Sequence, residues 1–359
     1  MHYSLEGATA VPAHEPGNPS DVNGMISLAA YSLDLPSYAC AQLRLIGPAS
    51  RLAGSVDLRW GTRSDGQNYA IDASAMDGAD AVIFQRYFPM EATWPLVEKA
   101  LGSGRPVIYD LDDNFLAVPE GHPMAARLAP VAPYARELLS RASMVTVSTP
   151  RLGRAFSAFN TEIEVLPNLI DERLWDVQGQ PRPQGPVRIV HAGTPSHAAD
   201  LAGVTEALAR VKQRYGRDVE LVFMGSSPEG LDALSIPFAE DYAAYARALV
   251  NLAPDIGVAP LEDTPFNRCK SAVKWLEYSA AGAAGVFSDC PAYECVRHGG
   301  TGLKVRPGQW EEAVSRLVED AALRRSLSGG ARAEALGRWS LRAGVKAYLR
   351  VWGRAVHGR

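Results

Sequence analysis

The sequence predicts an α/β protein of two Rossmann-like domains, each a doubly wound parallel sheet, that face each other across a cleft. Short apolar runs alternate with segments of helical periodicity along most of the 359 residues. This alternation stops once, at a segment rich in Pro, Gly and Gln (residues 178–186), and then restarts. Continuously apolar strands that are separated by helices indicate parallel sheets covered on both faces. The length also suits two domains.

The first domain is predicted to span residues 1–177. Residues 1–25, which include His2, His14 and several prolines, predict a loose arm or a loop over the cleft. The elements that follow are an apolar strand at 25–31, a helix at 38–54, a strand at 81–86, a helix around Pro95, a strand at 106–113, a helix at 125–141, a strand at 144–148, a helix at 150–159 and a strand at 164–167.

Residues 178–186 form the predicted linker, and residues 187–339 the second domain. Its elements are a strand at 187–192, a helix at 199–214, a strand at 219–224, a helix at 239–250, a strand at 255–259, a helix from about residue 269, a strand at 285–288, a turn at 298–302, a strand at 303–305 and further helices. Residues 340–359 contain a last helix that mixes basic and apolar residues. Two placements are open for it: packing back onto the first domain, or lying on an anionic membrane surface.

Composition limits the classes of function. Hydrophobic residues make up 47% and charged residues 21%, which is typical of a globular protein. The formal net charge is −4, so nucleic acid is an unlikely partner and any anion site must be local. The four cysteines lack metal-ligand spacing, no signal segment is evident, and no run of about 18 apolar residues occurs. We therefore expect a cytoplasmic protein.

Acidic residues end one predicted strand of the first domain. Ligands of doubly wound sheets bind at the carboxyl ends of the strands, where Asp110, Asp112 and Asp113 lie. Such close carboxylates repel one another unless a cation, an arginine or sugar hydroxyls lie between them, and Arg86 ends the neighbouring strand. Asp112 or Asp113 is a candidate general base, with His122 as the alternative. A metal site or a capping cluster fits the same residues.

The first strand of the second domain runs into a glycine-containing loop. Gly193 allows close approach of a ligand to the backbone, and Thr194 and His197 are candidate phosphate donors. The loop matches neither the Rossmann glycine fingerprint nor a Walker motif, so a simple capped loop remains the alternative.

Positive charge gathers where the helix from about residue 269 begins. On a helical wheel, Lys270, Lys274 and Glu277 share one polar stripe, and Arg268 precedes them. A helix N-terminus disfavours cations, so the pattern suggests a bound anion such as a diphosphate, with Glu277 free to accept hydrogen bonds from sugar hydroxyls. The alternative is a solvated face with a Lys274–Glu277 ion pair, worth about 0.3–0.5 kcal/mol.

Four segments of the sequence resemble those of GT-B-fold glycosyltransferases with a group-1-type C-terminal domain. They are VLPNLID at 165–171, AGTPSHAADL at 192–201, the segment 255–278 with its PFNRCKS and KWLEY motifs, and GGTGL at 299–303. In the first half, residues 84–86 and 107–113 are similar to the acceptor domain of the same subgroup. The resemblance covers most of residues 81–340.

The resemblance implies a metal-independent glycosyltransferase that uses a nucleotide-diphosphate sugar and a hydroxyl acceptor, without another cofactor. It implies that Glu277 binds the donor ribose and that Gly193, Thr194, Lys270 and Lys274 neighbour the diphosphate. Together with the charge pattern, it gives these expected donor-binding residues: Gly193, Thr194, His197, Arg268, Lys270, Ser271, Lys274 and Glu277. Arg86 and Asp110 are expected on the acceptor side, and Asp112, Asp113 and His122 are the catalytic candidates.

This sequence departs from the family pattern at two positions. Cys269 stands where many relatives carry a glutamate that contacts the donor sugar, and Leu169 replaces the glycine of the "PNG" segment. Two alternatives to a transferase remain: a nucleotide-sugar epimerase of the same fold, and a non-catalytic nucleotide- or sugar-binding protein.

Overall fold

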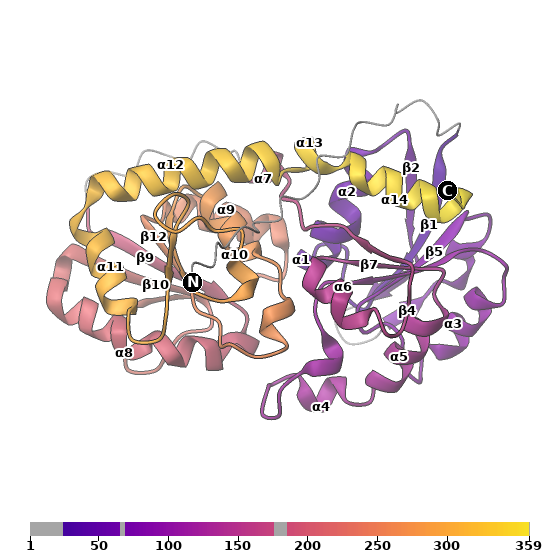
Figure 1. Ribbon diagram of the computed structural model, residues 1–359, viewed down its shortest axis with the longest axis horizontal. Helices are drawn as coiled ribbons and strands as arrows, with labels where there is room; N and C mark the ends of the chain where they lie inside the picture. The colour runs from indigo at the N-terminus through magenta and orange to yellow at the C-terminus, as the bar shows by residue number, and fades with distance from the viewer. Residues whose placement is uncertain (1–23, 65–68, 176–184, 359) are drawn as a thin grey trace, which may run out of the picture.

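The computed structural model describes residues 24–358 except 65–68 and 176–184. Most of the predicted N-terminal arm and most of the predicted linker lie outside the described residues. The described chain forms two α/β units side by side, each built on a six-stranded parallel sheet (Figure 1). The predicted fold class is confirmed.

The first sheet has the strand order β2-β1-β5-β6-β7-β8, and all its neighbouring strands are parallel. Its strands are β1 Ile26–Tyr31, β2 Val56–Trp60, β5 Ala81–Gln85, β6 Val107–Leu111, β7 Met144–Val147 and β8 Ile163–Val165. Every residue of β5 and β6 is buried, as expected for central parallel strands with helices on both faces. A short antiparallel hairpin, β3 Thr62–Ser64 and β4 Tyr69–Ile71, follows β2.

The helical segments of this unit begin with a continuous helical stretch that is π-helical in its middle. They are α1 Ala39–Ala41, the π-helical turn Gln42–Ile46, α2 Gly47–Arg51, α3 Trp94–Leu101, α4 Ala125–Leu128, α5 Ala132–Arg141, α6 Pro150–Phe156 and α7 Glu172–Trp175. The single helix predicted at 125–141 is instead two helices. Pro130, which lacks an N–H group, lies in the break between them, and Pro133 is in the first turn of the second helix, which begins at Ala132.

The second sheet has the order β11-β10-β9-β12-β13-β14 and is also parallel. Its strands are β9 Val187–Gly193, β10 Val219–Gly225, β11 Leu234–Ile236, β12 Ile256–Ala259, β13 Ala284–Ser288 and β14 Leu303–Val305. Its helices are α8 Ala198–Tyr215, α9 Tyr242–Leu252, α10 Val273–Ala280, α11 Trp310–Glu319 and α12 Ala321–Arg338.

The last helices return to the first unit. After α12, the chain continues through α13 Leu341–Gly344 into α14 Lys346–His357, which lies along the first sheet (Figure 1). Tyr348, Val351 and Trp352 are buried in one core cluster with Leu28 and Ile83 of the first sheet. The apolar face of α14 is therefore covered by protein. In the described part of the chain, no helix is both long and apolar enough to cross a membrane.

Candidate active site

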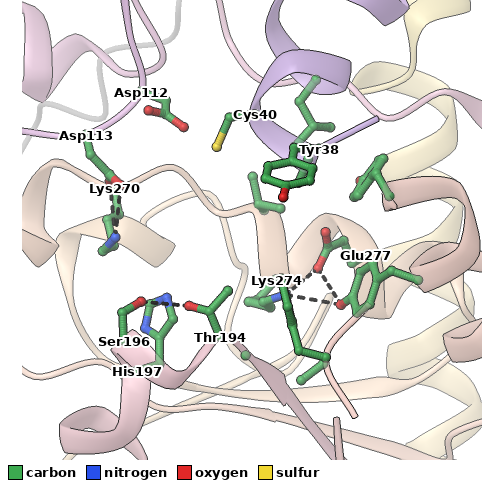
Figure 2. A pocket seen from close by; sticks show the side chains of 18 of the residues that line it. Tyr38, Cys40, Asp112, Asp113, Thr194, Ser196, His197, Lys270, Lys274 and Glu277 are labelled. Atoms are coloured by element: carbon green, nitrogen blue, oxygen red, sulfur yellow. Dashed lines mark hydrogen bonds and ion pairs between the residues drawn. The ribbon is translucent and has the colours of Figure 1, made fainter. Parts of the chain in front are cut away.

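A cavity of about 610 Å³ opens between the two units at the carboxyl ends of both sheets. The first unit contributes residues that follow β1, β5 and β6, and the second contributes residues that follow β9 and β12 together with the start of α10. Figure 2 shows Asp112, Asp113 and Cys40 on one side, with Thr194, His197, Lys270, Lys274 and Glu277 on the other. This is the place where doubly wound sheets bind ligands.

The loop after β9 forms one wall of the cavity. Gly193, Thr194 and His197 line it, and the Thr194 and Ser196 hydroxyl oxygens lie 2.7 Å apart. The His197 Nδ1 lies 2.8 Å from an Asp200 carboxylate oxygen, which fixes the ring orientation. Burial opposes ionisation of Asp200, but the hydrogen bonds from His197 and from the Glu262 backbone N–H keep its pKa below the ordinary value. Asp200 therefore holds His197 in place as an ionised partner.

Lys270 joins the two units. Its ammonium lies 3.1 Å from one carboxylate oxygen of Asp113 and 3.3 Å from the other, and 4.4 Å from the Phe266 ring centroid. The prediction that Lys270 shares a helix with Lys274 is wrong, because α10 begins only at Val273 and Lys270 has an extended backbone. The preceding turn, Asn267–Cys269, is not part of α10. It is held in place by hydrogen bonds from the Asn267 side chain to Asp200 and to the Glu262 carbonyl.

Lys274 and Glu277 form a second charged pair at the base of the cavity. The Lys274 ammonium lies 2.7 Å from the Glu277 carboxylate and 3.1 Å from the Tyr245 hydroxyl, which itself donates to Glu277 at 2.8 Å. The Glu277 side chain is 2% exposed, whereas that of Lys274 is 27% exposed. The ion pair of the solvated-face interpretation thus exists, but it lies in the cavity wall and not on an open surface.

Ser271 also lines the cavity, between these two lysines. Its hydroxyl accepts a hydrogen bond from the Asn168 side chain at 2.9 Å. Asn168 belongs to the VLPNLID segment, so this bond ties that segment to the start of α10.

On the opposite wall, the Arg86 side chain contacts a partly buried group of polar side chains. Its guanidinium contacts Asp34 at 2.6 Å, the Cys40 sulfur at 2.9 Å and Asp112 at 3.1 Å. Arg86 has a backbone φ of 55°, a left-handed conformation that is uncommon for a residue with a side chain. Such backbone strain is often found at functional sites. The sequence-based pairing of Arg86 with the carboxylates is confirmed for Asp112.

The two neighbouring carboxyl groups differ in acidity. Burial raises the pKa of Asp112, and the nearby Asp113 charge adds to this effect, while Arg86 offsets part of it. Burial opposes ionisation of Asp113 too, but the Lys270 ammonium and the Arg86 guanidinium together outweigh it and hold the pKa of Asp113 below the ordinary value. Environments that separate two carboxyl pKa values are typical of acid–base pairs in active sites.

Asp110 is not part of the cavity wall, so its predicted acceptor-side position is wrong. It lies inside β6, in register with Gln85 and Thr146 on the adjacent strands. Its carboxylate accepts hydrogen bonds from Arg44 at 2.6 Å and from Thr146 at 2.7 Å. Arg44, from the first helical stretch, is wholly buried, so this ion pair belongs to the core of the first unit.

Arg268 also lies outside the cavity lining, which contradicts its expected donor contact. Its guanidinium forms a two-pronged contact with Asp263, at 2.6 and 2.8 Å, and its side chain is 49% exposed. The short turn Asn267–Cys269 directs it to the surface.

His122 packs against the ring of Phe266 beside the cavity and is not among the lining residues. Burial lowers its pKa, and Lys270 and His197 lower it further. Its Nδ1 accepts the Met124 N–H at 3.1 Å, so in the neutral ring the proton is on Nε2. Neither nitrogen is then free to accept a proton from a substrate, which argues against the predicted role as a base.

Cys269 faces the first unit and does not line the cavity. Its carbonyl accepts a hydrogen bond from the Thr149 hydroxyl at 2.9 Å, and its side chain packs into the core of that unit. A cysteine therefore forms an interdomain contact at the position where the resemblance implies a glutamate in many relatives.

Several cavity residues were not singled out as site residues from the sequence. Tyr38, Cys40, Tyr245 and His191 line the cavity, and the Tyr38 hydroxyl contacts Glu240 of the second unit at 2.7 Å. A signal existed only for His191, a polar residue within an apolar strand. Among the described residues, no group of three or more His, Cys, Asp and Glu side chains is arranged to hold a metal ion.

Comparison with known proteins places these features in a family context. Residues 186–320 match the family model described as group 1 glycosyl transferases. No curated protein matches the sequence. Similar solved structures include a glycosyltransferase from Rickettsia africae, with 13% identity, a TM-score of 0.66, and coverage of 94% of this chain and 100% of that one.

Two other structures are similar over nearly their whole length. Sucrose-phosphate synthase from Thermosynechococcus elongatus has 14% identity and a TM-score of 0.68, covering 93% of this chain and 100% of that one. Anabaena HepE in complex with UDP-glucose has 16% identity and a TM-score of 0.64, covering 91% and 98%. The chain thus has the GT-B fold of these glycosyltransferases, and its second unit carries a domain of the group 1 glycosyl transferase type.

Proposed function

We propose that this protein is a glycosyltransferase that moves a sugar from a nucleoside-diphosphate sugar to a hydroxyl group of an acceptor. The observation that carries the proposal is the division of the cavity. One wall presents the Gly193 loop and two ammonium groups, and the other presents a partly buried carboxyl group, Asp112. A diphosphate suits the first wall, and a hydroxyl that must lose a proton suits the second.

The two lysines would stabilise the leaving group. As the bond between the sugar and the diphosphate breaks, negative charge gathers on the phosphate oxygens. The Lys270 and Lys274 ammonium groups are held by Asp113 and Glu277 at the cavity wall, so they need little reorganisation. Fixed cations at this position supply the charge that a metal ion supplies elsewhere, which supports a metal-independent reaction. HepE, which is similar in fold, was solved with UDP-glucose, and this supports a nucleotide-sugar donor.

Asp112 is the proposed base for the acceptor hydroxyl. Its raised pKa makes it the better proton acceptor of the neighbouring carboxylates, while Asp113 stays ionised beside Lys270. Arg86 contacts the Asp112 carboxyl group and Cys40 lies beside it, and both side chains help to position it.

The proposal is tested in two steps. The first measures thermal stabilisation by UDP, GDP, dTDP and CMP, because a ligand at 100 times its Kd adds about 2.7 kcal/mol of stability. The second measures release of the nucleoside diphosphate from the matching nucleotide sugar, with and without hydroxyl acceptors, and with and without EDTA.

Acceptor-dependent release that persists in EDTA supports the proposal, and its loss in Asp112→Asn supports the assigned base. Interconversion of the donor sugar without an acceptor would instead indicate an epimerase. Tight nucleotide-sugar binding without turnover, across a broad acceptor panel, would indicate a binding protein.

A further inference from the structure

His191 is a buried polar residue that faces the cavity and has no role in the proposed reaction so far. It lies in β9, two residues before Gly193, and is 4% exposed. We propose that its neutral ring accepts, at Nε2, a hydrogen bond from a hydroxyl group of the nucleotide sugar. This inference rests on the proposed function and adds a donor-recognition residue to it.

The hydrogen bonds around the ring fix which nitrogen carries the proton. Nδ1 lies 3.1 Å from the Val258 carbonyl oxygen, which also accepts the Tyr278 hydroxyl at 3.1 Å. The Tyr278 hydroxyl in turn accepts the Ala192 N–H at 2.9 Å. A carbonyl oxygen can only accept, so Nδ1 must donate to it. In the neutral ring Nε2 is therefore an acceptor.

This Nε2 is buried and has no hydrogen-bond partner among the described residues. Buried acceptors in proteins are nearly always satisfied, so one without a partner needs a ligand or a water molecule. A Cβ atom built on Gly193 would lie 3.0 Å from it. The glycine thus leaves no side chain of its own between the nitrogen and the cavity that His191 lines.

The ring stays neutral at physiological pH. Burial lowers the pKa of His191 to about 4, and the positive charges of Lys274 on α10 and His197 before α8 act in the same direction. Asp200 on α8 opposes them more weakly. Tyr278 contacts the same Val258 carbonyl and is uncharged, because burial raises its pKa.

A neutral acceptor nitrogen excludes a direct contact with phosphate oxygens, which also only accept. The donor groups of a nucleotide sugar near the phosphates are hydroxyls, on the ribose or on the transferred sugar. The Lys274 ammonium donates to Glu277 and Tyr245 and has no hydrogen bond to His191. A substrate hydroxyl therefore matches the unpartnered acceptor at Nε2.

The test uses two variants and one control. His191→Phe keeps a ring but removes the acceptor nitrogen, and His191→Gln restores an acceptor. Gly193→Ala keeps the His191 ring but places a methyl group in tight contact with Nε2; Gly193 has no positive φ, so its backbone conformation is open to alanine. His298→Phe is the control, because His298 is exposed, does not line the cavity and lies in the same unit. Circular dichroism checks folding.

Isothermal titration then measures Kd for the stabilising nucleoside diphosphate, for its 2′- and 3′-deoxy forms, and for the nucleotide sugar. We expect His191→Phe to weaken nucleotide-sugar binding about tenfold, the loss of one hydrogen bond to a buried group, with partial rescue in His191→Gln. Equal weakening of the free diphosphate assigns the hydroxyl to the ribose, and the matching deoxy form should then bind wild type and His191→Phe equally. An unchanged diphosphate affinity assigns the hydroxyl to the transferred sugar.

Two results would overturn the inference. One is wild-type affinity, within twofold, in His191→Phe, whatever the effect of Gly193→Ala, because Gly193 also adjoins the expected diphosphate position. The other is binding to wild type that tightens about tenfold per pH unit of acidification and loses this dependence in His191→Phe, because His191 would then act as a cation. If wild type binds no nucleotide or nucleotide sugar at all, the proposed function fails as well.

Discussion

Replacing Lys274 by methionine should both destabilise the protein and remove nucleotide binding. Lys274 is the only ammonium group hydrogen-bonded to Glu277 among the described residues, and the Glu277 carboxylate is 2% exposed. Removing one partner of a buried ion pair costs about 3–5 kcal/mol. The Tyr245 hydroxyl still donates to the carboxylate at 2.8 Å, and Lys274 is 27% exposed, so we expect about 3 kcal/mol, at the low end of that range.

Urea unfolding measures the first effect, and the thermal shift with the best stabilising nucleotide measures the second. Lys304→Met is a matched control, since Lys304 is 25% exposed and its partner Asp289, at 3.8 Å, is 43% exposed. That surface pair contributes about 0–1 kcal/mol, so its loss should leave the nucleotide shift intact. A Lys274→Met protein with the stability of the control, or with an unchanged nucleotide shift, would refute the role given to Lys274.

Four further outcomes follow from the geometry. Arg268→Ala should change the Kd for the nucleotide less than twofold by titration calorimetry, because the Arg268 guanidinium pairs with a surface carboxylate. A tenfold weaker affinity would show that Arg268 does belong to the donor site. Arg44→Met should lower the free energy of unfolding in urea by about 4 kcal/mol, because it leaves Asp110 buried without its cation. Adding Asp110→Asn should recover part of this loss. A loss under about 1 kcal/mol would contradict a core ion pair. Because burial raises the pKa of Asp112, the transfer rate should fall with decreasing pH at a higher pH than an ordinary aspartate would give, and a kcat profile that stays flat down to pH 4 would exclude this base. Folding lowers the pKa of His191 from 6.5 to about 4. As the pH falls from 6.5 to 4, the wild-type protein should therefore lose about 3 kcal/mol more free energy of unfolding than His191→Phe, measured by urea unfolding. Equal losses in the two proteins would show that the ring is not buried in its neutral form.

The strands of both sheets were predictable where both of their faces are buried. Central strands such as β5 and β6 are buried throughout, and their sequences are therefore largely apolar runs bounded by polar residues, a pattern typical of central strands. The edge strand β11 was missed because it has only three residues, two of them exposed, so it leaves no such run. The hairpin strand β4 is exposed throughout and was missed for the same reason.

The site residues that the sequence could predict are those that lie directly at the carboxyl end of a strand. Asp112 directly follows β6, Gly193 is the last residue of β9, and both line the cavity. Asp110 was misplaced because strand position alone does not reveal which buried cation meets its side chain. Cys40 could not be found, since its role depends on contact with Arg86, 46 residues away in the sequence.

The return of α14 to the first sheet has a consequence for synthesis of the chain. The second unit is inserted between β8 and the helix that completes the core around β1 and β5. While the ribosome is still making residues 187–338, the face of the first sheet that Tyr348 and Trp352 will cover is bare apolar surface. We therefore expect the first unit to complete this core only after the second has emerged, and the exposed surface to favour chaperone binding until then.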